Sequence, residues 1–198
     1  MNRIIKFKIK MIKIGITGSL SSGKTTASKI LSTGRGPLFS ADNAVREIYK
    51  NKNFKIFISK KFRIKNNKQL KLSLKKLILK NKTNLNKLEK IIHPLVRKKM
   101  MKFTLKNKNK KILFYEIPLL IESKLTKFFN TIVFIKSKYK IRLERFKSKR
   151  GNKKLFDLLD NKQMKDHKKI KFCDHVVVNE KNLKILKKNL STIITKYE

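Results

Sequence analysis

The 198-residue sequence predicts a single α/β domain in which helices flank a central parallel sheet. Two observations lead to this prediction. Short apolar runs alternate with longer segments of helical periodicity, which is the pattern of a doubly wound parallel sheet. The first apolar run, 12–17, leads into Gly18-Ser19-Leu20-Ser21-Ser22-Gly23-Lys24-Thr25, and a helical pattern follows at 26–31. Strand, loop and helix in this order are the context expected of a phosphate-binding loop.

The loop matches G-x-x-x-x-G-K-[ST] at each required position. Gly18 and Gly23 allow backbone angles that a side chain would block, so peptide N–H groups can face a phosphate. The helix N-terminus adds unpaired donors and partial positive charge. Lys24 is then placed to reach the β- and γ-phosphates of ATP, and the Thr25 hydroxyl to bind Mg²⁺. The residues expected to bind ATP here are Gly18, Ser19, Leu20, Ser21, Ser22, Gly23, Lys24, Thr25 and Thr26.

The second predicted strand, 37–40, follows a turn rich in glycine and ends just before Asp42. The carboxyl ends of parallel strands share one edge of the sheet, where ligands bind in this fold class. Asp42 is therefore expected on the same edge as the phosphate loop. There it could orient or deprotonate an acceptor hydroxyl, or it could cap the helix predicted at 44–49, and the residues leave both roles open.

The segment from about 50 to 106 is rich in lysine and asparagine and has apolar residues at helical spacing, so it is expected to be helical. It contains His93-Pro94. A histidine beside a proline is more often a structural turn residue than a functional group, and no base or metal partner stands at suitable spacing, so a turn is predicted here. His167, Cys173 and His175 are too irregularly spaced to predict a zinc site.

A buried strand is predicted at 111–117, where an apolar and aromatic run ends in Glu116. The pattern resembles a Walker B strand, whose carboxylate helps to hold Mg²⁺ or its water shell. A glutamate that merely ends a strand is the alternative, and the residues do not separate the two. Further strands are expected at 131–135 and 173–179, and helices after 118–122, at 155–167 and at 183–197.

Three of the chain's eight arginines, Arg142, Arg145 and Arg150, fall within nine residues. The planar guanidinium fits phosphate oxygens, and small-molecule kinases use a mobile lid to place arginines over the transferred phosphoryl group. We therefore predict a lid at about 140–168. A solvated basic helix face is the alternative.

The net charge of +42 favours anionic ligands and weak, salt-sensitive contact with nucleic acid. The lysines are spread along the whole chain and no nucleic-acid-binding module is recognised, so no specific nucleic-acid partner is expected. A lone cysteine, Cys173, excludes an internal disulfide and suits a reducing compartment. No apolar run is long enough to cross a membrane. We expect a cytoplasmic monomer or weak homo-oligomer, with residues 1–10 as an extension ahead of Met11.

Taken in order, the motifs resemble the dephospho-CoA kinase family over about residues 12–195. The matching segments are Ile14-Gly15-Ile16-Thr17 with the phosphate loop, Ala41-Asp42 through Ala44-Val45-Arg46, Leu88-Glu89, His93-Pro94-Leu95-Val96, Pro118-Leu119-Leu120 with Glu122, the stretch from Arg145 to Arg150, Gln163, and Asp174 through Asn179. Three departures stand out. Ser40 replaces the first aspartate of the family's Asp-Ala-Asp, the loop interior carries serines where the family usually has glycines, and Leu159 replaces an arginine.

This resemblance implies a P-loop kinase with a helical acceptor-binding insertion at about 50–106 and a small lid. The implied reaction is Mg²⁺- and ATP-dependent phosphorylation of the ribose 3′-hydroxyl of dephospho-CoA, the last step of coenzyme A synthesis. Implied roles are catalysis by Lys24, Asp42 and Arg145, acceptor binding by Asp42, Arg46 and His93, closure over ATP by Arg150, and Mg²⁺ binding by Thr25, with Glu116 reaching the ion through water. The alternatives are another nucleoside monophosphate or small-molecule kinase on this scaffold, or a nucleic-acid-dependent ATPase.

Overall fold

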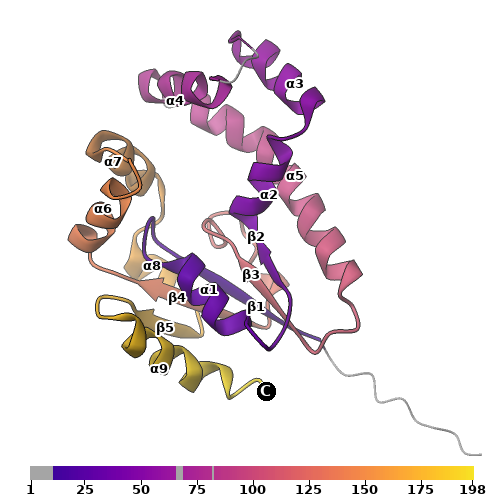
Figure 1. The fold of residues 1–198 in the computed structure, drawn as a ribbon, viewed down its shortest axis with the longest axis vertical. Helices are drawn as coiled ribbons and strands as arrows, with labels where there is room; N and C mark the ends of the chain where they lie inside the picture. The colour runs from indigo at the N-terminus through magenta and orange to yellow at the C-terminus, as the bar shows by residue number, and fades with distance from the viewer. Residues whose placement is uncertain (1–10, 66–68, 82) are drawn as a thin grey trace, which may run out of the picture.

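The computed structural model describes residues 11–65, 69–81 and 83–198, so the extension predicted at 1–10 lies outside the described residues. Within them, five strands form one parallel sheet in the order β2-β3-β1-β4-β5 (Figure 1). The strands are β1 (Ile12–Gly18), β2 (Leu38–Ser40), β3 (Ile112–Glu116), β4 (Thr131–Lys136) and β5 (His175–Val178). The predicted central parallel sheet is confirmed.

Side chains that alternate along the strands build a core on each face of the sheet. Phe114 of β3 faces α1 (Lys24–Ser32) and α9 (Leu183–Ile194), and both helices bury apolar residues against that face. The next residue, Tyr115, points to the opposite face, where it packs with residues of α5 (Thr83–Lys106) and of the turns after β3. The strands therefore read as nearly continuous apolar runs, because both faces are covered.

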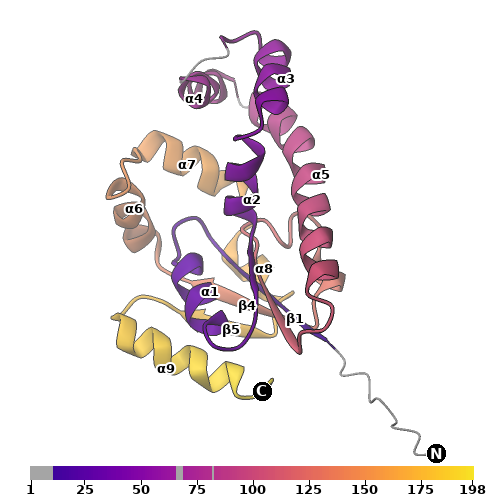
Figure 2. The ribbon, with the colours of Figure 1, turned by 45° about the vertical axis from the view of Figure 1, so that its right-hand side comes forward.

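A third core lies beyond the edge of the sheet, between four helices. These are α2 (Ala41–Ile48), α3 (Lys52–Phe62), α4 (Leu70–Lys80) and the first half of α5. Figures 1 and 2 show α3 and α4 standing clear of the sheet, above the end of α5 that lies farthest from it. The helical character predicted for 50–106 is confirmed among the described residues.

Proline lies inside a continuous helix in this region. The prediction that His93-Pro94 forms a structural turn is wrong, because both residues fall within the 24-residue helix α5. Proline removes one backbone hydrogen bond from a helix interior. The buried side chains of Leu88, Ile92 and Met100 on either side of Pro94 supply packing that holds the helix together across this gap.

The segment after β4 folds into three short helices, α6 (Tyr139–Lys147), α7 (Lys153–Lys162) and α8 (Asp166–Ile170). The single helix predicted at 155–167 is wrong, because Gln163 adopts an extended backbone with ψ of 148° and separates α7 from α8. The break lets Lys169 of α8 become fully buried and pair with Glu122. The helix predicted after 118–122 is only a one-turn 3-10 helix, Thr126–Phe128.

None of the helices in the described part of the chain is both long and apolar enough to cross a membrane.

Close packing against β1 makes one strand glycine a sensitive position. A Cβ atom added to Gly15 would lie 2.7 Å from Leu120 Cδ1 and 2.9 Å from Phe129 Cγ. We expect Gly15→Ala to lower the free energy of unfolding by about 1–3 kcal/mol, the usual cost of overpacking a core. Urea unfolding followed by circular dichroism measures this loss.

The matched control is Gly34→Asn. Gly34 has φ of +77° and no heavy atom within 4 Å of an added Cβ. Asparagine tolerates the left-handed region better than most residues, so the expected cost is about 1 kcal/mol or less. A Gly15→Ala protein as stable as the wild type would contradict the packing described for β1.

Candidate active site

The carboxyl ends of β1, β2 and β3 meet around a cavity of about 910 Å³. Most of the residues predicted for the site line this one cavity: Leu20, Ser21, Gly23, Lys24, Thr25, Thr26, Asp42, Arg46, Glu116, Arg145 and Arg150. Gly18, Ser19 and Ser22 are buried within the loop behind it. The remaining predicted residue, His93, lines a neighbouring cavity instead. Residues far apart in sequence are thus gathered as parallel-strand topology requires.

Lys24 is the first residue of α1 and is only 9% exposed. Its Nζ donates a hydrogen bond to the carbonyl oxygen of Ser19 at 2.8 Å. Burial lowers the pKa of Lys24 from 10.5 to about 8, and the negative charge of Asp42 is the largest effect opposing that shift. The cavity therefore holds a poorly solvated ammonium, to which a phosphate group would be strongly attracted.

Thr25 and Glu116 lie in direct contact at the floor of the site. The Thr25 hydroxyl donates a hydrogen bond to Glu116 Oε1, and Glu116 is 2% exposed. A hydroxyl beside a buried carboxylate offers the oxygen ligands that Mg²⁺ prefers. The described residues contain no cluster of three or more His, Cys, Asp or Glu side chains able to hold a metal. This donor set fits Mg²⁺ that also takes phosphate and water ligands.

Asp42 is not the cap of its helix. Ser40 caps α2, because its hydroxyl accepts a hydrogen bond from the Asn43 backbone N–H at 3.4 Å. The capping alternative for Asp42 is therefore wrong, and the serine that departs from the family pattern performs that task. Asp42 is exposed at the second position of α2, and Arg46 lies one turn further along the same helix. Both face the cavity.

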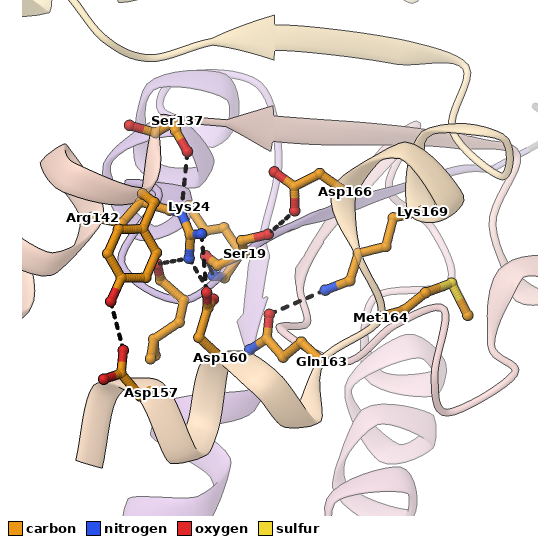
Figure 3. A network of polar contacts seen from close by, with 12 residues as sticks. Ser19, Lys24, Ser137, Arg142, Asp157, Asp160, Gln163, Met164, Asp166 and Lys169 are labelled. Carbon is orange, nitrogen blue, oxygen red and sulfur yellow. Dashed lines mark hydrogen bonds and ion pairs between the residues drawn. The ribbon is translucent and has the colours of Figure 1, made fainter. Parts of the chain in front are cut away.

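The three clustered arginines have different environments. Arg142 is 7% exposed and forms an ion pair with Asp160 of α7 (Figure 3). Arg145 is half-buried and donates to Ser22 O at 3.3 Å and to Asn179 O at 3.1 Å. Arg150 is exposed, lines the cavity and has a left-handed backbone with φ of 61°. Of these three, Arg145 and Arg150 line the cavity. The solvated-face alternative fails for Arg142, which is buried, and for Arg145, which is half-buried.

His93 belongs to a second cavity, of about 280 Å³, between α2, α5 and the turn at 117–125. Aliphatic side chains form most of its wall, and Asp42 and Pro118 line both cavities. Burial lowers the pKa of His93, so its imidazole is more readily neutral than in water. His93 therefore lies beside the phosphate cavity and does not enter it.

Two polar residues near the loop had no role from the sequence. Asn179 follows β5, is 7% exposed and donates from Nδ2 to Ser22 O at 2.8 Å. Asn179 follows the carboxyl end of a strand, as Asp42 does. The position that predicted Asp42 as a site residue could therefore have predicted Asn179 as well. Asp166 of α8 accepts a hydrogen bond from the Ser19 hydroxyl. No spacing rule predicts that contact, because 147 residues separate the two.

Comparison with known proteins gives one consistent result. A family model described as dephospho-CoA kinase matches residues 12–184. A relative named dephospho-CoA kinase, from Bartonella quintana, is 34% identical over 186 residues, which cover 91% of this chain and 95% of the relative. The crystal structure of TT1252 from Thermus thermophilus has a TM-score of 0.76 and 25% identity, with 95% of this chain and 98% of that chain covered. Dephospho-CoA kinase from Campylobacter jejuni shares the fold, with a TM-score of 0.62, 21% identity and coverage of 94% and 97%.

The pKa of Lys24 predicts a pH dependence of nucleotide binding. Because burial lowers that pKa to about 8, the ammonium loses its proton as the pH rises through this value. We expect ATP affinity, measured by titration calorimetry, to fall between about pH 7 and pH 9 as this charge is lost.

Lys24→Arg is the matched variant, since arginine stays protonated throughout this range. Its ATP affinity is expected to be weaker, because the guanidinium is larger, but not to fall over the same pH interval. An equal decline in both proteins would assign the pH dependence to another group.

Proposed function

The chain belongs to the dephospho-CoA kinase family, and we propose that the cavity at its phosphate loop is where the family's reaction takes place. That reaction, ATP + dephospho-CoA → ADP + CoA, is the final step of coenzyme A biosynthesis. It transfers the γ-phosphoryl group of ATP to the ribose 3′-hydroxyl of the acceptor. The observation that supports this assignment best is that Lys24, suited to the donor, and Asp42, suited to the acceptor, line one cavity.

On the donor side, the loop N–H groups and Lys24 bind the phosphates of ATP. The ammonium leaves the Ser19 carbonyl for a phosphate oxygen, which is the stronger partner because it is charged. Charge that develops on the transferred group is stabilised by donors already in place, so little reorganisation is needed during the reaction.

On the acceptor side, Asp42 accepts the proton of the 3′-hydroxyl, or orients that hydroxyl towards the γ-phosphorus. Arg46, one turn away on α2, binds the acceptor's diphosphate. The aliphatic cavity beside His93 opens from Asp42 and suits an uncharged part of the acceptor. Holding donor and acceptor at adjoining sites supplies the alignment that phosphoryl transfer depends on.

We propose that Mg²⁺ binds beside Thr25, with Glu116 reaching the ion through a water molecule. When bound, the ion neutralises charge on the β- and γ-phosphate oxygens. The Thr25 hydroxyl, now bonded to Glu116, would supply one oxygen ligand to the ion, and the buried carboxylate would accept hydrogen bonds from its water ligands.

Arg145 and Arg150 are proposed to complete the site from the lid. Arg145 already lies at the loop, bonded to Ser22 O, and stabilises charge on the transferred group. Arg150 comes from the exposed segment between α6 and α7 and closes over the ATP phosphates.

For the protein as a whole, we propose a cytoplasmic location and a monomer or weak homo-oligomer, with ATP and dephospho-CoA as the specific ligands. The lone cysteine fits a reducing compartment, and burial raises the pKa of the Cys173 thiol to about 12, which makes it unreactive.

Removing the Asp42 charge is expected to affect turnover selectively. Asp42→Asn keeps the shape of the side chain but removes its basicity, so kcat should fall by about 10²–10⁴-fold while the KM for ATP changes little. A coupled ADP-release assay with dephospho-CoA measures both constants. Glu144→Gln, which removes an exposed carboxylate of α6, is the control and is expected to keep wild-type kcat. Unchanged turnover in Asp42→Asn would remove Asp42 from the mechanism.

An acceptor panel separates the proposed function from its two alternatives. ATP consumption should be stimulated by dephospho-CoA, and not by nucleoside monophosphates or by DNA or RNA. Lys24→Ala, expected to lose about 10³-fold or more in rate, reports any contaminating kinase in the preparation. Stimulation by a monophosphate would favour another small-molecule kinase. Stimulation by nucleic acid would favour the ATPase alternative.

A further inference from the structure

The middle of the phosphate loop contains a non-glycine residue in a conformation that L-amino acids avoid. Ser21 has φ of 57°, in the left-handed region, where its Cβ approaches the following carbonyl oxygen. Glycine would adopt this conformation without such a contact. A serine persists there only when surrounding contacts hold the backbone in place.

One contact lies within the loop, where the Ser22 N–H donates to Ser19 O at 3.1 Å. The others come from outside the loop and act on the carbonyl groups of the two residues that flank Ser21. On one side, Leu20 O accepts a hydrogen bond from Arg142 Nη1 at 3.3 Å. On the other side, Ser22 O accepts from Asn179 Nδ2 at 2.8 Å and from Arg145 Nη1 at 3.3 Å. The donors belong to α6 and to the end of β5, which are remote from the loop in sequence.

Arg142 is itself held rigidly. Its Nε donates to Ser137 O at 3.1 Å, and its two terminal nitrogens bond both carboxylate oxygens of Asp160, with Nη2 to Oδ2 at 3.1 Å (Figure 3). The side chain of Arg142 is 8% exposed and that of Asp160 is 16% exposed. The charge of Arg142 is therefore directed at Asp160 and not into the phosphate cavity.

Asn179 is also held in place by its neighbours. Its backbone N–H donates to Lys136 O at 2.8 Å, which continues the pairing of β5 with β4. Its side chain fills the space beside Gly23, where an added Cβ would lie 2.1 Å from Asn179 Nδ2. The second glycine of the motif thus leaves room for this side chain to reach Ser22 O.

We propose that Arg142 and Asn179 are positioning residues that hold the phosphate loop in its binding conformation, with Asp160 anchoring Arg142. We call these three residues the loop clamp. If Ser21 relaxed to a right-handed conformation, the adjacent peptide groups would rotate and their N–H groups would leave the phosphate position. By preventing this, the clamp lets the loop bind ATP without first ordering it. The clamp explains how this loop works with serines at positions where related loops have glycines.

The first test removes the contacts that form the clamp. Arg142→Ala removes the donor to Leu20 O, and Asp160→Asn leaves that donor but removes the charge that anchors it. Both changes should weaken ATP binding, by about fivefold or more for Arg142→Ala and by less for Asp160→Asn, while kcat at saturating ATP changes less than the affinity. Titration calorimetry with ATP alone measures the affinity directly, so this readout does not depend on the acceptor or on the proposed reaction.

Lys140→Ala is the matched control, because Lys140 is an exposed cation on the same helix as Arg142. It is expected to leave ATP affinity unchanged. Unchanged affinity in Arg142→Ala would overturn the proposal. A loss confined to kcat would also overturn it, since that result would place Arg142 on the transferred phosphoryl group.

A second substitution distinguishes positioning of the loop from general support of the fold. Ser21→Gly removes the conformational penalty, so in the Arg142→Ala background it should restore ATP affinity by about fivefold, or about 1 kcal/mol. In the protein with Arg142 intact, the gain should be smaller, because the clamp already holds the loop. Equal effects in the two backgrounds would show that Arg142 does not act through Ser21.

If Arg142→Ala fails to fold, the same cycle is run with Asp160→Asn and Ser21→Gly, and additivity there would equally overturn the proposal. The clamp variants can give the expected ATP affinities while the wild type does not phosphorylate dephospho-CoA. That result would support the clamp and contradict the proposed function.

Discussion

The ammonium of Lys24 must remain charged while it is almost fully buried, and much of the surrounding architecture follows from that requirement. Burial alone lowers its pKa, and the nearby cations Lys169 and Arg142 lower it further. Each of these two is neutralised by its own carboxylate, since Lys169 Nζ lies 2.8 Å from Glu122 Oε1 and Arg142 pairs with Asp160. Among the ion pairs of the described residues, Lys24 has none. The acidic groups that raise its pKa, Asp42 and Glu116, do not form an ion pair with it, so its charge remains available to a phosphate.

Several of the few carboxylates of this strongly basic chain lie around the phosphate loop, which the composition alone could not show. The chain has 54 basic residues and only 12 acidic ones. Five of the acidic residues border the phosphate loop or pair with cations beside it: Asp42, Glu116, Glu122, Asp160 and Asp166. Without them the buried cations around the loop would repel one another and lower the pKa of Lys24 further. Strong positive charge over the surface therefore coexists with a locally balanced site, and argues for anionic ligands without identifying one.

Features with a local periodic signal were predicted well. The sheet, the phosphate loop and the helices within 50–106 follow from alternation, motif context and apolar spacing. The strand ends also placed Asp42 and Glu116 on one edge correctly. Contacts without such a signal were not predictable. The pairing of Arg142 with Asp160 joins two helices that no motif links. The pairing of Ser19 with Asp166 lies beyond the break at Gln163, which neither glycine nor proline marks.

The same contacts divide the segment proposed as a lid, about 140–168, into an anchored and an unanchored part. Arg142 of α6 bonds Leu20 O, and Asp166 of α8 bonds Ser19, so both ends of the lid are tied to the phosphate loop. A closing movement that keeps these bonds is confined to the stretch between α6 and α7, which contains Arg150. Arg145 lies on the anchored part, already bonded to Ser22 O, whereas Arg150 lies on the part that can move. We therefore propose different tasks for these two arginines, which are five residues apart. Arg145 is in place before ATP binds, and Arg150 is brought to the phosphates by closure.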